Sequence, residues 1–188
     1  MTKRIMFVGP SGIGKTTLAQ YVAEKEDIPF ISGSMSDLLP ATKGVSHNEI
    51  LSLGSEAMYK SDFQLLNKRN KLFKDRGYFV TDRSYADLAA YFWYKQSRSI
   101  PECEMEHFIC QCKTLMEEQC DLAIFLPLNL CNYSGWAMED NKKRITNRFF
   151  QIQISSLMGE LLADWEISTL CLPSLDLEER KEQIDYHI

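Results

Sequence analysis

The sequence lacks any long hydrophobic run, which limits where the protein can reside. Its longest uninterrupted apolar stretch, Leu122 to Leu128, includes a proline. A membrane-spanning helix needs roughly 20 apolar residues, far more than this stretch provides. Near the N-terminus, Ile5 to Val8 is too short for the core of a signal peptide and runs directly into glycines. We therefore expect no membrane partner and a cytoplasmic location.

An excess of basic residues is also missing. The chain has 21 Lys and Arg against 26 Asp and Glu, a formal net charge of −5. This balance argues against broad electrostatic attachment to nucleic acid, although it allows a local basic groove. One stretch, Lys60 to Arg76, is rich in basic side chains. It is either a solvated helix face or a track for a polynucleotide backbone.

The six cysteines follow neither a disulfide framework nor a known metal pattern. Four of them lie between Cys103 and Cys120, in a C-x6-C-x-C-x7-C spacing that matches no standard zinc site. Without a signal peptide, we expect free thiols. The sequence also shows no internal repeat, low-complexity segment or interdomain linker. Residues 1–188 are therefore predicted to form a single domain.

Apolar strands alternate with helical stretches along the chain, a pattern typical of an α/β fold with a mainly parallel sheet. The expected strands are residues 3–8, 28–31, 78–81, 121–126 and 167–172. The expected helices are residues 15–25, a segment starting at the capping box 46–49, then 61–76, 85–96, 103–119, 141–164 and the tail after 173. The predicted fold is a five-stranded sheet flanked by helices.

A glycine-rich segment follows the first strand directly. Residues 9–16, GPSGIGKT, fit G-x-x-x-x-G-K-S/T, the Walker A motif or P-loop, and a helix is expected next. Lys15 can reach the β- and γ-phosphates of ATP, and the Thr16 hydroxyl can ligate Mg²⁺. Thr17 is more simply a residue of the helix start. The predicted nucleotide-binding residues are Gly9, Pro10, Ser11, Gly12, Ile13, Gly14, Lys15, Thr16 and Thr17.

A carboxylate and a guanidinium follow the third strand. Asp82 stands where a Walker B acid would lie beside the P-loop, and Arg83 comes next. Asp82 can orient Mg²⁺ or accept the proton of an acceptor hydroxyl, while Arg83 holds the acceptor. Thr16 and Asp82 are the predicted metal ligands. The alternative is that Asp82 caps the following helix and Arg83 pairs with a surface acid.

A strand followed by Asp82-Arg83-Ser84, with a further acid at Asp87, resembles the small P-loop nucleoside and nucleotide kinases. These include deoxynucleoside kinases, thymidylate kinases and the ribosylnicotinamide kinase group with its bacteriophage relatives. The resemblance implies a P-loop NTPase fold with ATP and Mg²⁺ as cofactors. It also implies that Asp82 acts at the catalytic centre and that Arg83 contacts the acceptor.

The resemblance further implies a mobile lid at about residues 129–150. Arg144 and Arg148 are four apart there and are expected on one helix face. Lid arginines neutralise charge on the transferring phosphoryl group and close the site against water. The alternative is a solvated basic face at the start of a helix. Asn141 follows Asp140 where similar phage proteins often have glycine.

The predicted function is an ATP-dependent kinase, a transferase that moves the γ-phosphate to a hydroxyl or 5′-phosphate of a nucleoside or nucleotide, as in phage-type nucleotide metabolism. One alternative is a bacteriophage DNA modification enzyme that phosphorylates 5-hydroxymethyluracil in DNA, acting in the host cytoplasm with DNA as its substrate. Others are a non-kinase P-loop NTPase and an ATP-binding module without catalysis. The sequence leaves base specificity and oligomeric state open. The predicted catalytic residues are Lys15, Asp82, Arg83, Arg144 and Arg148.

Overall fold

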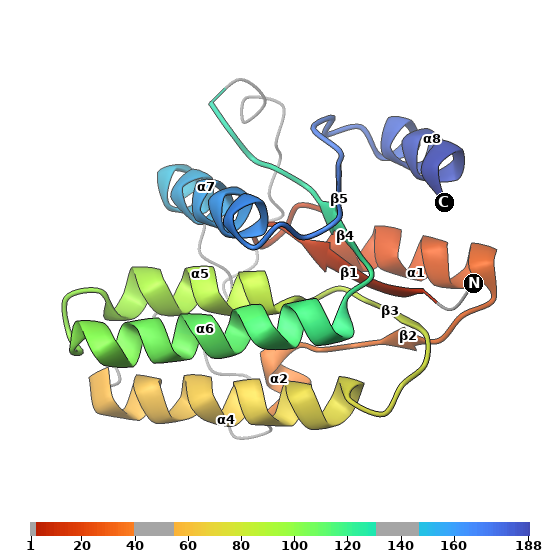
Figure 1. Ribbon diagram of the computed structural model, residues 1–188. Coiled ribbons are helices and arrows are strands. Elements are labelled where there is room, and N and C mark those ends of the chain that lie inside the picture. Colours follow the sequence, from red (N-terminus) through yellow and green to blue (C-terminus); the bar gives the residue numbers. More distant parts are fainter. Residues whose placement is uncertain (1–2, 40–54, 131–146) are drawn as a thin grey trace.

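A parallel five-stranded sheet with the order β2-β3-β1-β4-β5 forms the centre of the protein (Figure 1). The computed structural model describes residues 3–39, 55–130 and 147–188. The strands are β1 Arg4–Val8, β2 Phe30–Ile31, β3 Phe79–Thr81, β4 Leu122–Phe125 and β5 Thr169–Cys171. The helices are α1 Lys15–Glu26, α2 Met35–Leu38, α4 Ser55–Phe73, α5 Tyr85–Gln96, α6 Glu102–Gln119, α7 Arg148–Asp164 and α8 Leu177–His187. The predicted fold class is confirmed.

Strand β1 separates two hydrophobic clusters because its side chains alternate between the faces of the sheet. Ile5 and Phe7 belong to a cluster with residues of α1 and α8. Met6 and Val8 belong to the other cluster, which includes residues of α4, α5, α6 and α7. Figure 1 shows α1 and α8 on one side of the sheet and α4, α5 and α6 on the other. Both faces are covered, which explains why the strand is apolar throughout.

The position of β1 fixes where the site forms. It pairs with β3 on one side, with Ile5 opposite Val80, and with β4 on the other, with Phe7 opposite Ile124. All three strands are parallel, so their carboxyl ends meet at one edge of the sheet. The residues that follow β1 and β3 are therefore neighbours in space.

Helix boundaries agree with the sequence prediction at α5, differ by one residue at α1 and α6, and differ more at α4 and α7. Helix α4 starts at Ser55, six residues before the predicted start at position 61. Helix α7 starts at Arg148, not near 141, because the Asn147 side chain caps it by accepting the Phe150 backbone N–H at 3.2 Å. The helix predicted at the capping box 46–49 lies outside the described residues.

Short helix α2, Met35–Leu38, follows β2. Ser34 is the N-cap, and its hydroxyl accepts the Asp37 backbone N–H at 3.3 Å. Within the ranges 3–39, 55–130 and 147–188, no helix combines the length and the apolar character needed to cross a bilayer.

Candidate nucleotide-binding site

The segment between β1 and α1 turns so tightly that glycine is required. A Cβ added at Gly9, where φ is +150°, would lie 2.6 Å from the Leu126 carbonyl oxygen. Gly14 has φ +96° and is the N-cap of α1, with no side-chain cap. Thr17 is the third residue of α1 and so lies in its first turn, as expected for a residue of the helix start. The resulting backbone can approach a ligand closely.

Lys15 folds back onto its own loop. Its side chain is buried, and Nζ donates to the carbonyl oxygens of Gly9 at 2.6 Å and Pro10 at 2.8 Å. The cation therefore lies at the P-loop rather than in solvent. Phosphate oxygens are stronger partners for an ammonium group than backbone carbonyls, so a bound phosphate can replace them.

Thr16 and Asp82 meet, as the sequence predicted for the metal ligands. The Thr16 hydroxyl donates to Asp82 Oδ2 at 2.6 Å, which joins the start of α1 to the end of β3. Asp82 is only 4% exposed, and its Oδ1 has no hydrogen-bond partner among the described residues. A hydroxyl and a carboxylate are the hard oxygen donors that Mg²⁺ prefers, and Mg²⁺ typically takes few protein ligands. These two residues therefore fit the expected ion.

The helix after Asp82 has a different cap from the one considered in the sequence. Ser84 is the N-cap of α5, and its hydroxyl accepts the Asp87 backbone N–H at 2.9 Å. Asp82 is thus not needed as a cap. Arg83 is half-buried, and a Cβ added at Gly33 would lie 3.0 Å from Arg83 Cβ. The loop after β2 and the turn after β3 are therefore in close contact at this arginine.

Asp87 connects α5 to the P-loop. The Asp87 side chain is 3% exposed, and its Oδ1 accepts the Gly9 backbone N–H at 3.3 Å. Burial raises the pKa of this carboxyl, while the positive charges of Lys15, Arg83 and Arg69 act in the opposite direction. The sequence identified Asp87 only as part of the kinase resemblance.

Arg69 of α4 holds the backbone around Arg83 and Gly33 through hydrogen bonds. It is 3% exposed and donates to the Ser84 carbonyl oxygen at 2.6 Å and to the Gly33 carbonyl oxygen at 3.0 Å. Burial lowers the pKa of this guanidinium. Arg69 belongs to the basic stretch considered as a polynucleotide track, but a buried side chain cannot contact a polynucleotide. The other basic side chains of that stretch are exposed: Lys60, Lys68, Lys71, Lys74 and Arg76.

Of the two predicted lid arginines, one lies within the described residues and the other does not. Arg148 is the first residue of α7 and is exposed. Arg144 lies outside the described residues. Because Asn147 is an N-cap with extended backbone, the predicted helix spanning both arginines is wrong. An asparagine three residues before a buried Phe150 is a capping signal that the sequence analysis passed over.

Helix α7 also reaches the P-loop through a glutamine that the sequence analysis missed. Gln151 is fully buried, and its Oε1 accepts the Ser11 backbone N–H at 3.2 Å. Gln151 of α7 thus holds the P-loop backbone at Ser11. A lone glutamine near a helix start carries no signal in the sequence from which this contact could be read.

The sheet order, the P-loop and the Thr16–Asp82 contact define a P-loop NTPase-type kinase fold. The chain belongs to the AAA domain family, whose model matches residues 4–180.

Several solved kinases share this fold. Deoxyadenosine kinase from M. mycoides with bound dATP is 13% identical and superposes with a TM-score of 0.73, over 98% of each chain. Thymidylate kinase from Candida albicans is 19% identical, with a TM-score of 0.65 over 99% of this chain and 92% of that one. Shikimate kinase from Acinetobacter baumannii is 14% identical, with a TM-score of 0.62 over 100% and 92%. At these identities the likeness establishes the fold alone.

Curated relatives match only a short segment. The ATP-dependent zinc metalloprotease FtsH of Chlorobium luteolum is 39% identical over 61 residues, which is 32% of this chain and 9% of that protein. FtsH 2 of Salinibacter ruber is 42% identical over 55 residues, 29% of this chain and 8% of that protein. The chain thus spans less than a tenth of the length of these two relatives.

Proposed function

We propose that residues 1–188 form one kinase domain that transfers the γ-phosphate of ATP to a hydroxyl or 5′-phosphate of a nucleoside or nucleotide. The observation that carries this proposal is the 2.6 Å contact between Thr16 and Asp82, at the residue that follows the P-loop lysine Lys15. It joins a phosphate-binding loop to a buried carboxylate that comes from the neighbouring strand. This arrangement suits phosphoryl transfer, in which catalysis is mainly positioning and charge stabilisation.

Each site residue has a distinct role in this proposal. The P-loop amides and Lys15 bind the phosphate chain of ATP. Thr16 and Asp82 hold Mg²⁺, which when bound neutralises charge on the phosphates. The second oxygen of Asp82, Oδ1, faces no protein partner among the described residues and can accept the proton of the acceptor hydroxyl. Arg148, together with Arg144, completes the charge clamp on the transferring group.

The acceptor is proposed to lie on the β3–β2 side of the P-loop. There Arg83 adjoins Gly33, and Arg69 holds the backbone of Gly33 in place. Arg83 Nε has no hydrogen-bond partner among the described residues, so the guanidinium can contact an acceptor oxygen. Two of the structural neighbours are named as deoxyadenosine and thymidylate kinases, which supports a nucleoside or nucleotide as acceptor.

Replacing Gly33 with alanine is expected to impair acceptor binding selectively. The added methyl group would lie 3.0 Å from Arg83 Cβ, and because Arg69 holds the Gly33 carbonyl and that of Ser84, the residue after Arg83, we expect the Arg83 side chain to shift. Displacement of a positioning group by even 1 Å can cost about 10²-fold in rate. We expect a raised KM for the acceptor and an unchanged KM for ATP in steady-state assays. An equal rise in both values would contradict this assignment.

A label-transfer assay tests the proposed function. The protein is incubated with γ-labelled ATP and Mg²⁺ and a panel of nucleosides, nucleoside monophosphates and duplex DNA with or without hydroxymethylated pyrimidines. Label on a free nucleoside or nucleotide supports the proposal. Label confined to the modified DNA would instead support the DNA modification enzyme. Omitting Mg²⁺ should remove transfer in either case.

A second candidate function is ATP hydrolysis without an acceptor. The segment shared with FtsH favours it, because this relative is named as an ATP-dependent protease and not as a kinase. The same assay separates the two. Acceptor-independent release of labelled phosphate, at a rate unaffected by any member of the panel, would support the NTPase and reject the kinase.

A further inference from the structure

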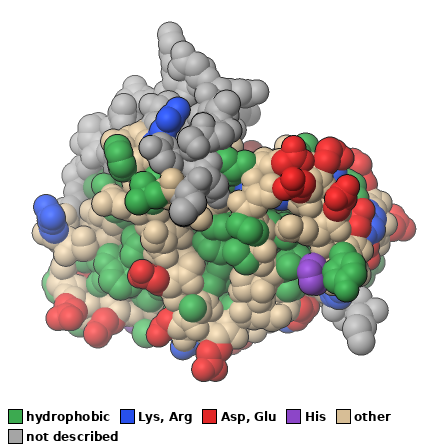
Figure 2. Space-filling model, turned by 90° about the horizontal axis from the view of Figure 1, so that it is seen from above, with side chains coloured by type: hydrophobic (Ala, Val, Ile, Leu, Met, Phe, Trp, Pro, Cys, Tyr) green, Lys and Arg blue, Asp and Glu red, His purple; other side chains and the backbone are tan. Residues whose placement is uncertain are grey.

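Helix α8 carries acidic side chains outward and a single arginine inward. Figure 2 shows Asp and Glu side chains gathered at one side of the molecule. Arg180 of the same helix is only 2% exposed. A lone cation buried beneath an acidic helix surface needs an explanation, because burial of a charge is costly without a partner. The exposed acidic residues of α8 and its cap are Asp176, Glu178, Glu179, Glu182 and Asp185.

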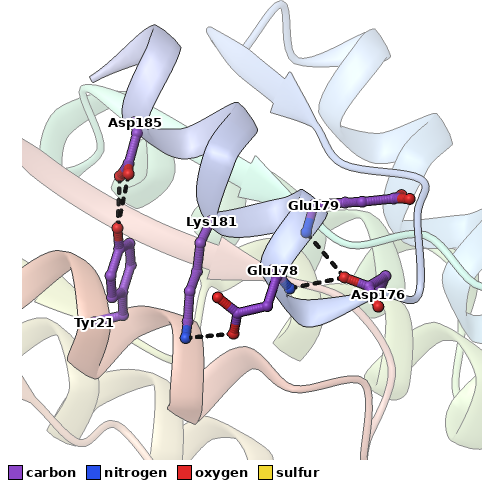
Figure 3. A network of polar contacts seen from close by, with 6 residues as sticks. All are labelled: Tyr21, Asp176, Glu178, Glu179, Lys181 and Asp185. Carbon is purple, nitrogen blue, oxygen red and sulfur yellow. Dashed lines mark hydrogen bonds and ion pairs between the residues drawn. The ribbon is translucent and has the colours of Figure 1, made fainter.

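Helix α8 is capped and attached to α1 by polar contacts along its length (Figure 3). Asp176 caps α8 by accepting the backbone N–H groups of Glu178 and Glu179. At the other end, Asp185 accepts the Tyr21 hydroxyl at 2.7 Å, which ties α8 to α1. The Lys25 ammonium reaches the same carboxylate at 2.9 Å. The arginine is therefore held against the protein rather than free to leave it.

Arg180 contacts the P-loop directly. Its Nη1 donates to the Ile13 carbonyl oxygen at 2.7 Å, and a Cβ added at Gly14 would lie 3.8 Å from the same nitrogen. The guanidinium thus lies beside the backbone that precedes Lys15 and Thr16. Arg180 reaches the loop from α8, which follows β5. Asp82 reaches it from the end of β3, and β3 and β5 lie on opposite sides of β1 in the sheet.

The charge of Arg180 has no counterpart in the described part of the chain. Two of its nitrogens, Nε and Nη2, have no hydrogen-bond partner there, and no carboxylate pairs with the guanidinium. Burial lowers its pKa to about 10, which still leaves it protonated at neutral pH. Hydrogen bonds from a charged donor to an anion are the strong ones, so an anionic ligand is the natural partner.

We propose that Arg180 is a further nucleotide-binding residue, whose guanidinium supplies counter-charge to the phosphate chain held by the P-loop while its Nη1 fixes the Ile13 carbonyl. The inference rests on the proposed function in one respect only, namely that the loop takes a nucleoside triphosphate. Because Arg180 contacts the P-loop from α8, whereas Asp82 and Arg83 follow β3, it serves the donor nucleotide and not the acceptor. It is a binding and positioning residue, with no part in proton transfer.

The test compares inorganic tripolyphosphate with ATP as ligands, because the first has the phosphates without the base. Affinities are measured by calorimetric titration for the wild-type chain and for Arg180→Gln, which removes the charge. Loss of a charge-assisted hydrogen bond is expected to weaken both ligands by about tenfold. Arg180→Lys, which keeps the charge, should stay within about threefold of wild type for tripolyphosphate.

Asp185→Asn is the matched control. It weakens the attachment of α8 to α1 through Tyr21 and Lys25 but leaves the guanidinium in place. We expect a lower melting temperature with unchanged affinity for both ligands. If Asp185→Asn and Arg180→Gln weaken binding equally, Arg180 acts through helix docking alone, and the inference is wrong.

The remaining outcomes separate this inference from the proposed function. Wild-type protein that binds neither ligand would reject the proposed function itself. Normal binding by wild type and by Arg180→Gln would reject only the role of Arg180. A loss confined to ATP would show that the guanidinium contacts the base or ribose, which also overturns the proposal. If Arg180→Gln does not fold, the test uses Arg180→Lys instead. A tenfold loss of tripolyphosphate affinity in that variant, which keeps the positive charge, would contradict the proposed role of Arg180.

Discussion

Asp82→Asn is expected to lower the turnover number of phosphoryl transfer by about 10³-fold, the range that general base catalysis contributes. The amide keeps the shape of the side chain and can still meet the Thr16 hydroxyl, which contacts Asp82 Oδ2 at 2.6 Å in the native chain. It cannot accept the acceptor proton, and it is a poorer ligand for Mg²⁺. Label transfer to the acceptor identified by the panel, at saturating ATP, measures the effect.

The control for this variant is a carboxylate outside the site. Asp164→Asn changes an exposed residue at the last position of α7 and should leave turnover unchanged. Magnesium-free ATP affinity of Asp82→Asn should stay within a few-fold of wild type, because the P-loop amides and Lys15 are intact. Full activity of Asp82→Asn would remove Asp82 from the mechanism and favour a module that binds ATP without catalysis.

Lys15→Met is expected to reduce turnover by about 10²- to 10³-fold, the usual cost of losing one preorganised group that stabilises transition-state charge. Methionine has a similar length and fills the same buried position. It leaves the Gly9 and Pro10 carbonyl oxygens without the donor that contacts them at 2.6 and 2.8 Å. We therefore also expect weaker binding of ATP, measured by titration, and a lower melting temperature.

Lys74→Met, an exposed change after α4, is the matched control and should alter neither quantity. The role of Lys15 also predicts a pattern across ligands. If its ammonium binds the β- and γ-phosphates as proposed, the variant should lose more affinity for ATP than for AMP. An equal loss for both nucleotides would indicate that Lys15 only supports the shape of the loop.

The sequence was most informative where local chemistry and local geometry coincide. The glycines of the P-loop need positive φ angles, and the chain shows them at Gly9 and Gly14. Strand ends could be placed because apolar runs stop at polar residues, so Asp82 and Thr16 could be predicted to meet. The helix after Ser84 could be predicted to the residue, with its range Tyr85–Gln96 confirmed.

Contacts between distant segments could not be predicted in the same way. Gln151 and Arg180 reach the P-loop from helices that are 140 and 167 residues away along the chain. Nothing in the spacing of Gln151 was used to distinguish an inward side chain from a solvated one. For Arg180 a weak signal exists, since Ile184 follows it by one helical turn and is fully buried, which places both on the inner face.

In the basic stretch Lys60 to Arg76, the count of basic residues overestimates the positive charge that is exposed. Arg69 adds to the local positive charge in the sequence, but in the fold it is buried and binds backbone carbonyls. The helix carries its other basic residues outward, and Lys60 pairs with Glu56 at 2.6 Å within it. Whether a cation is exposed depends on which helix face packs against the sheet, and composition alone does not contain that information.

The two hydrogen bonds of Arg69 also have a mechanical consequence. They link the 19-residue helix α4 to the loop after β2 and to the turn after β3, so we expect these three segments to move together. A ligand that displaces Arg83 or Gly33 is therefore expected either to break the two Arg69 hydrogen bonds or to move α4 as well. If the acceptor binds there as proposed, we expect a bulkier acceptor to displace α4, and spin labels placed on its exposed lysine positions would register that motion.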